Sequence, residues 1–153
     1  MQGTLNLGIE KEIKVLVTSD WFTIANCKAY PKKLYIFGDN ILRAGCAGQA
    51  QIRHEFNTSG LATKFYPGMG DGDFFSDDKY QKCVEIISTD IEKIKKRFNN
   101  EMYNFEVIVF PIAGLGTGLS QLPTKAPKVF KYLCDQLDIH FGVKTKPDGT
   151  LYV

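Results

Sequence analysis

Short runs of apolar residues alternate with longer amphipathic segments along this chain, and that order restricts the fold more than any other feature. Strands are indicated by the β-branched and aromatic runs at 13–17, 33–37, 61–66 and 105–110. Helices are indicated at 49–56, before a turn at 57–60, and in the segments that begin near residues 76 and 124. Alternating strands and helices favour an α/β fold, with a mostly parallel sheet and helices on its faces.

The segment after Ser76 has the clearest helical pattern. Ser76 is a natural N-cap, and Asp77 and Asp78 follow it in the first turn, where the helix dipole favours acids. One buried face is indicated by apolar residues at three-and-four spacing: Tyr80, Cys83, Val84, Ile87, Ile91, Ile94 and Phe98. A last helix is expected from about Thr124, with Pro127 in its first turn, where a missing N–H matters little.

The length of 153 residues is close to that of one domain, so a single domain over 1–153 is expected. Residues 1–12 are expected to be loosely ordered, and 143–153 to form a short hairpin or tail. Residues 20–27 fit an extended segment and a short helical turn equally well. Trp21, within that segment, is expected in the core.

Composition excludes several function classes. The net charge of +2 is too small to indicate a nucleic-acid partner. The four cysteines form no C-x-x-C pair and only two histidines accompany them, so no metal or other cofactor is expected. Widely spaced cysteines indicate free thiols in a reducing compartment. No apolar run approaches the ~20 residues that span a bilayer, and no signal peptide is evident. A cytoplasmic location without a membrane partner is therefore expected.

A first glycine-rich loop follows the strand at 33–37. The residues expected to bind a ligand there are Gly38, Asp39, Asn40, Gly45, Ala47, Gly48 and Gln49. Glycine lets backbone N–H groups approach an anion closely, and a helix from Gln49 would offer its first N–H groups to a phosphate. Asp39 and Asn40 can hydrogen-bond ribose hydroxyls or a base edge. Gly-Asp-Asn is also typical of a plain turn.

A second loop follows the strand at 105–110 and contains three alternating glycines. The residues expected to bind a ligand there are Pro111, Ala113, Gly114, Leu115, Gly116, Thr117, Gly118 and Leu119. Such a loop can form a nest of N–H groups around a diphosphate, and Thr117 adds a hydroxyl. Ligands of open α/β sheets bind beyond the carboxyl ends of the strands, so the two loops are expected to meet. The alternative is a wide connection to the last helix.

The two loops resemble those of macrodomains, in which an asparagine precedes a glycine cluster and a later strand ends in proline and glycines. The chain is also similar to small uncharacterised bacterial and phage proteins with FGDN and GLGTGL patterns; the resemblance covers about 34–137. It implies a three-layer α/β/α fold that binds ADP-ribose. It places Asn40 at the distal ribose, with Gly45, Ala47 and Gly48 on one side of the diphosphate and 114–119 on the other.

Catalytic residues are harder to assign. One macrodomain branch removes ADP-ribose with a lysine and with an aspartate that follows Gly-x-Gly-Leu, but Ser120 stands at that position and cannot act as a carboxylate. Lys64 is a candidate for the lysine, the alternative being a surface residue. Asp71 and Asp73 are candidate general bases if their loop folds over the ligand, the alternative being turn formation. Asn40 completes the candidate catalytic set.

Three functions remain open at this point. The first is binding of ADP-ribose or a related nucleotide, with hydrolysis of ADP-ribosyl groups. The second is a non-catalytic protein that recognises or sequesters a nucleotide signal. The third is a structural or protein-interaction domain whose glycine loops are only turns. The first two imply a small-molecule nucleotide ligand, and the first also implies an ADP-ribosylated macromolecule as partner.

Overall fold

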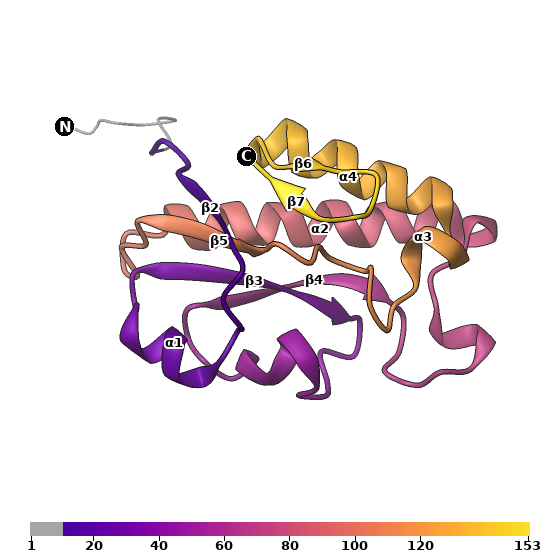
Figure 1. Ribbon diagram of the computed structural model, residues 1–153, viewed down its shortest axis with the longest axis horizontal. Coiled ribbons are helices and arrows are strands. Elements are labelled where there is room, and N and C mark those ends of the chain that lie inside the picture. Colours follow the sequence, from indigo (N-terminus) through magenta and orange to yellow (C-terminus); the bar gives the residue numbers. More distant parts are fainter. Residues whose placement is uncertain (1–10) are drawn as a thin grey trace.

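The computed structural model describes residues 11–153, and within them four strands form a parallel sheet (Figure 1). The strands are β2 (Val15–Thr18), β3 (Lys33–Asn40), β4 (Thr58–Lys64) and β5 (Val107–Pro111). Their order is β2-β5-β3-β4, so β5 inserts between two earlier strands. The predicted α/β class and parallel sheet are confirmed. All four strands end at the same edge of the sheet, where both glycine-rich loops begin.

Helices cover both faces of this sheet. In Figure 1, α2 (Tyr80–Asn99) and α4 (Pro127–Phe141) lie on one face, and α1 (Ile24–Ala29) lies on the other. Side chains of a strand alternate between the faces. Leu34 and Ile36 therefore join the larger core under α2 and α4, whereas Tyr35 and Phe37 join the smaller core under α1.

The periodicity of α2 is confirmed at six of the seven predicted apolar positions, which are buried. Tyr80, the seventh, is exposed, and Asp90 is buried in addition. The helix begins later than predicted. Asp77–Lys79 forms a 3-10 turn, and the α-helix starts at Tyr80. The Asp77 carboxylate does not cap its own helix. It accepts the N–H groups of Lys128 (3.1 Å) and Val129 (3.2 Å) at the start of α4.

The region between β3 and β4 differs most from the prediction. β3 continues through Gly38 to Asn40, and β4 begins at Thr58, in the segment predicted as a turn. The predicted helix over 49–56 is wrong in type and length, since only a 3-10 helix at Gly48–Ile52 forms. Gly48 has a φ of +58°, which lies in the left-handed region that favours glycine. The backbone at Gly48 is therefore that of a turn, and a regular right-handed helix cannot begin there.

The last helical segment is interrupted. α3 (Leu122–Lys125) and α4 are separate helices, because Ala126 between them has φ −149° and ψ 69°. A residue before proline avoids the helical region, and Pro127 follows Ala126 directly. At the C-terminus, β6 (Lys144–Thr145) and β7 (Leu151–Tyr152) pair antiparallel as a short hairpin, one of the two forms expected for 143–153.

Several smaller expectations are also resolved. Residues 20–27 include the start of α1, whose Asn26 N–H is capped by Thr23 Oγ1 at 3.0 Å. The loose ordering expected for 1–12 lies largely outside the described residues. All four cysteines are free thiols, as predicted. Across 11–153, each helix is too short or too polar to cross a membrane.

Candidate functional site

The two glycine-rich loops line one cleft at the carboxyl edge of the sheet. Its volume is about 310 Å³. Its lining comprises Trp21, Gly38, Ala47, Gly48, Gln49, Ala50, Gly114, Gly116, Gly118, Leu119 and Ser120. Eight of these are residues that the sequence singled out for ligand binding. The loops lie on the neighbouring strands β3 and β5, so the parallel sheet itself brings them together.

The side chain of Gln49 holds the two loops at a fixed spacing. The N–H of Gly38 donates to Gln49 Oε1 (3.0 Å), and Gln49 Nε2 donates to the carbonyl of Gly114 (3.1 Å). The amide side chain thus connects the end of β3 to the loop after β5. Because both polar atoms of the Gln49 side chain form hydrogen bonds within the protein, this side chain serves as a structural part of the cleft lining.

The second loop requires glycine at two positions. Gly114 and Gly116 have φ values of +89° and +79°, a region that side chains rarely adopt. A Cβ on Gly116 would also lie 3.1 Å from Leu122 Cβ and 3.2 Å from Thr63 Cβ. The N–H groups of 115–120 donate to no acceptor within residues 11–153. The cleft is therefore bordered by a loop whose backbone requires glycine and whose amide donors have no partner within residues 11–153.

Other side chains of the second loop serve the loop itself. Thr117 Oγ1 donates to the carbonyl of Ala113 at 2.7 Å, which stabilises the turn from inside. Leu115 and Pro111 are buried, and Leu115 belongs to the larger core. Thr117, Leu115, Pro111 and Ala113 therefore do not line the cleft, although the sequence included them in the ligand set.

In the first loop, Asn40 closes the turn. Its Nδ2 donates to the carbonyl of Ala44 (2.9 Å), and its Oδ1 accepts the N–H of Leu42 (3.1 Å). The side chain is 8% exposed and does not line the cleft. The amides of 45–49 have no acceptor within the described part of the chain. Gly45 itself stands outside the cleft lining.

A group of charged residues, buried except for the half-buried Arg43, anchors the first loop to α2. Arg43 forms two hydrogen bonds to Asp90 of α2, at 2.7 and 2.9 Å, and a third to Asp39 at 3.3 Å. Arg53 pairs with Asp39 at 2.7 Å and also donates to the carbonyl groups of residues 44 and 45. Asp39 is thus occupied by two arginines. It supports the loop and stands outside the cleft lining.

Lys64 and the two candidate aspartates lie outside the cleft lining. Lys64 is only 6% exposed, which rules out the surface-lysine alternative. Its Nζ donates to the carbonyl of Gly68 and lies 4.6 Å from the centre of the Phe74 ring. Burial lowers the pKa of Lys64, and the nearby Asp73 carboxylate opposes this effect. Asp73 accepts the N–H of Gly70 at 2.9 Å, and Asp71 is exposed.

Three cleft residues were missed by the sequence reasoning: Trp21, Ala50 and Ser120. The Trp21 side chain is 82% exposed, so the expectation that it lies in the core is wrong. A signal for Trp21 did exist, because it lies three residues after the end of β2 and the carboxyl ends of parallel strands form the ligand edge. The Ser120 hydroxyl is hydrogen-bonded to that of Thr63 at 2.7 Å.

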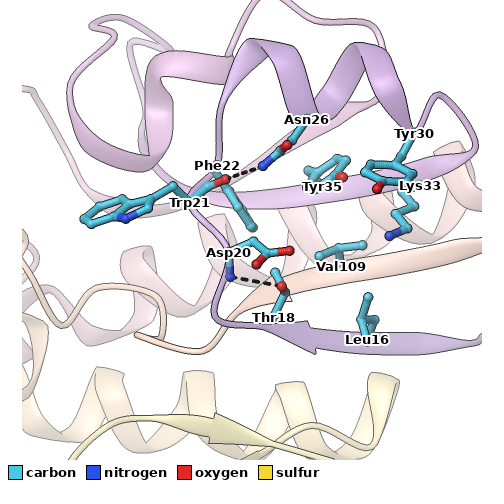
Figure 2. Close-up of a pocket in the computed structure, with 10 residues that line it drawn as sticks. All are labelled: Leu16, Thr18, Asp20, Trp21, Phe22, Asn26, Tyr30, Lys33, Tyr35 and Val109. Atoms are coloured by element: carbon cyan, nitrogen blue, oxygen red, sulfur yellow. Dashed lines mark hydrogen bonds between the residues drawn. The ribbon is translucent and has the colours of Figure 1, made fainter.

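Figure 2 shows a second, smaller pocket of about 60 Å³. It is lined by Leu16, Thr18, Asp20, Trp21, Phe22, Asn26, Tyr30, Lys33, Tyr35 and Val109. The Trp21 ring points away from Tyr35 and Lys33 in this view. Burial, together with nearby Cys27, Tyr30 and Asp20, raises the pKa of the Tyr35 phenol to about 12, so it is neutral at physiological pH.

Within 11–153, no group of three His, Cys, Asp or Glu residues is arranged to hold a metal ion.

Comparisons with known proteins place the chain in a family. No curated protein and no solved structure matches the chain. A family model does match, over residues 17–136, a range that includes both glycine-rich loops and Trp21. The chain therefore belongs to DUF7831, a family of unknown function.

Proposed function

We propose that the cleft between the two glycine-rich loops binds a phosphate-bearing nucleotide, ADP-ribose or a close relative. The observation that carries this proposal is that backbone amides of 45–49 and 115–120, which have no acceptor within residues 11–153, belong to loops lining one cleft. Backbone N–H groups at the ends of parallel strands are donors that suit a phosphate or diphosphate. The resemblance to macrodomains supports the same ligand, and helices on both sheet faces agree with a three-layer fold.

The donors would be loop amides, with little help from a helix dipole. The 3-10 helix at Gly48–Ile52 has only five residues, whereas the sequence predicted a longer helix with a stronger positive end. The nearby arginines are paired with Asp39 and Asp90. Binding would therefore rest on neutral amide donors, whose loops are held by the hydrogen bonds of Gln49 and by the ion pairs of Asp39 and Asp90.

The proposal is for a binding protein and not for a hydrolase. General acid–base catalysis needs a titratable group within hydrogen-bond reach of the reacting atoms. Among the described residues, those that line the cleft include no ionisable side chain. Lys64, Asp71 and Asp73 stand outside the lining, and Asp39 is held by arginines. Recognition or sequestration of a nucleotide is the function these side chains support.

Titration calorimetry with ADP-ribose, ADP and NAD tests the proposal, using Gly118→Val against a matched control. Gly118 lines the cleft, and a Cβ there would meet no atom within 4 Å, so valine should narrow the cleft without disturbing the fold. Gly72 has equally open surroundings and lies outside the lining, so Gly72→Val should bind like the wild type. Gly118→Val should bind ADP-ribose at least about tenfold more weakly.

Two outcomes of that titration would contradict the proposal: no heat from the wild type at millimolar ligand, or equal binding by Gly118→Val. A protein with valine at both Gly116 and Gly118 would be uninformative, because a side chain at Gly116 would collide with Leu122 and Thr63 and disturb the fold. Catalysis is tested separately by incubation with an ADP-ribosylated protein and mass measurement. The modification should stay in place; its release by the wild type but not by Asn40→Ala would show a hydrolase.

A further inference from the structure

Trp21 is a large apolar side chain that the fold leaves in solvent. It is 82% exposed and lines the cleft together with the glycines of both loops. Leu119, from the second loop, is 69% exposed and lines the same cleft. Since an exposed tryptophan beside a cleft gains nothing from core packing, a role in ligand contact accounts for its position.

The backbone around Trp21 is fixed even though its ring is free. The Trp21 carbonyl accepts a hydrogen bond from Asn26 Nδ2 at 2.9 Å (Figure 2). The next residue, Phe22, is 3% exposed and packs edge-to-face on Tyr35, with ring centres 5.3 Å apart. Burial of Phe22 anchors the segment on the sheet, and Figure 2 shows the Trp21 ring projecting from it in a different direction.

No other aromatic ring or cation of residues 11–153 stacks on the Trp21 ring; the aromatic and cation–π pairs of the protein involve other residues. An indole with free faces at the edge of a binding cleft is suited to stack on a planar ring of the ligand. Stacking of this kind tolerates any nucleobase, because every base has a π-face.

We propose that Trp21 stacks on the aromatic base of the ligand while the two loops hold its phosphates. This inference rests on the proposed function and deepens it. It assigns the ligand to nucleotides with a base, as opposed to pyrophosphate, inorganic phosphate or a sugar phosphate. The base gains its contact from Trp21, and the phosphates gain theirs from the amides of the loops.

Fluorescence gives a direct test, because Trp21 is the single tryptophan of the chain. ADP-ribose should change the emission of the wild type in a saturable manner, and pyrophosphate should change it far less. Trp21→Leu should bind ADP-ribose roughly 5- to 150-fold more weakly by calorimetry, the range expected for loss of one stacked base, and Trp21→Phe should retain most of the affinity. Pyrophosphate should bind Trp21→Leu and the wild type equally.

Met102→Leu is the control, since Met102 is 84% exposed and lies outside the cleft lining. If Trp21→Leu binds ADP-ribose as the wild type does while Gly118→Val does not, stacking is wrong and the proposed function stands. If Trp21→Leu loses ADP-ribose and pyrophosphate in equal measure, Trp21 shapes the cleft and does not stack on a base. If the wild type binds neither compound, both proposals fail.

Discussion

At the scale of single residues, Gln49 decides the geometry of the cleft. Gln49→Leu keeps the approximate size of the side chain but leaves the Gly38 N–H and the Gly114 carbonyl without partners. Loss of two hydrogen bonds of this kind should lower the free energy of unfolding by about 2–3 kcal/mol. The spacing of the loops would also relax, so ADP-ribose should bind about tenfold more weakly. Urea denaturation and calorimetry measure the two effects.

Gln81→Leu is the comparison for Gln49, because Gln81 is an exposed residue of α2 whose side chain donates a hydrogen bond to Glu85. It should change neither stability nor affinity measurably. A Gln49→Leu protein with the stability and affinity of the wild type would show that the bridge between the loops is dispensable.

Lys64 should make stability depend on pH. Burial lowers the pKa of Lys64 below its ordinary value of 10.5, so the folded state releases the proton of Lys64 at lower pH than the unfolded state. Burying the charged ammonium group of Lys64 lowers the free energy of unfolding, and this cost is present in full below the pKa that Lys64 has in the folded state. The cost disappears as the pH rises towards 10.5, the ordinary pKa of lysine. The wild type should therefore gain stability relative to Lys64→Met as pH increases through that window.

Urea denaturation of both proteins between neutral pH and pH 10.5 checks this prediction for Lys64, with Lys14→Met as the control. Lys14 is exposed, so its replacement should show no such trend. A constant difference between the wild type and Lys64→Met across the range would mean that Lys64 is charged to the same extent in both states.

At the scale of secondary-structure elements, Asp77 links the two long helices. Within the described residues, no side chain at the N-cap position of α4 caps that helix. Instead, the carboxylate of Asp77, which lies just before α2, accepts the N–H groups of two residues in the first turn of α4. The negative charge of a carboxylate at a helix N-terminus also interacts favourably with the helix dipole and stabilises the helix. Asp77→Ala should therefore lower stability by about 1 kcal/mol, or roughly 2–4 °C in Tm, as for a lost N-cap. Asp78→Ala, at the exposed neighbour, should leave the melting curve unchanged.

The elements that could be predicted were those whose pattern is local. The apolar stripe of α2 and the buried run of β5 suffice to identify a helix and a strand, and the structure confirms both. The helix expected over 49–56 was wrong because its conformation depends on Gly48 in a left-handed turn and on Arg53, which folds back onto Asp39.

Burial and pairing over long distances could not be predicted in the same way. Trp21 is apolar but exposed, because the chain buries Phe22 at that point instead. Asp39 is a polar residue beside a glycine loop, yet its partners are Arg43 and Arg53. Asp90 of α2 in turn holds Arg43. One signal was available: Asp90 lies three residues after Ile87 on the apolar face of α2, where an acid must find a partner.

At the scale of the whole molecule, a ligand in the cleft should protect two short segments far apart in the sequence. The amides of 45–49 and 115–120 have no acceptor within residues 11–153, so they should exchange with deuterium rapidly in the free protein. Saturating ADP-ribose should slow their exchange together, while the amides of α2, already bonded within a helix, should gain protection only through global stabilisation. Exchange followed by mass spectrometry of short peptides resolves these regions.

The same ligand should raise the stability of the entire domain, since it binds the folded state alone. At one hundred times its Kd it should add about 2.7 kcal/mol, which corresponds to roughly 5–10 °C in Tm for a domain of this size. In Gly118→Val, both the shift in Tm and the protection of the two segments should disappear, because one cleft produces both. Protection of one segment without the other would mean that the loops act separately, and the single binding cleft would be the wrong description.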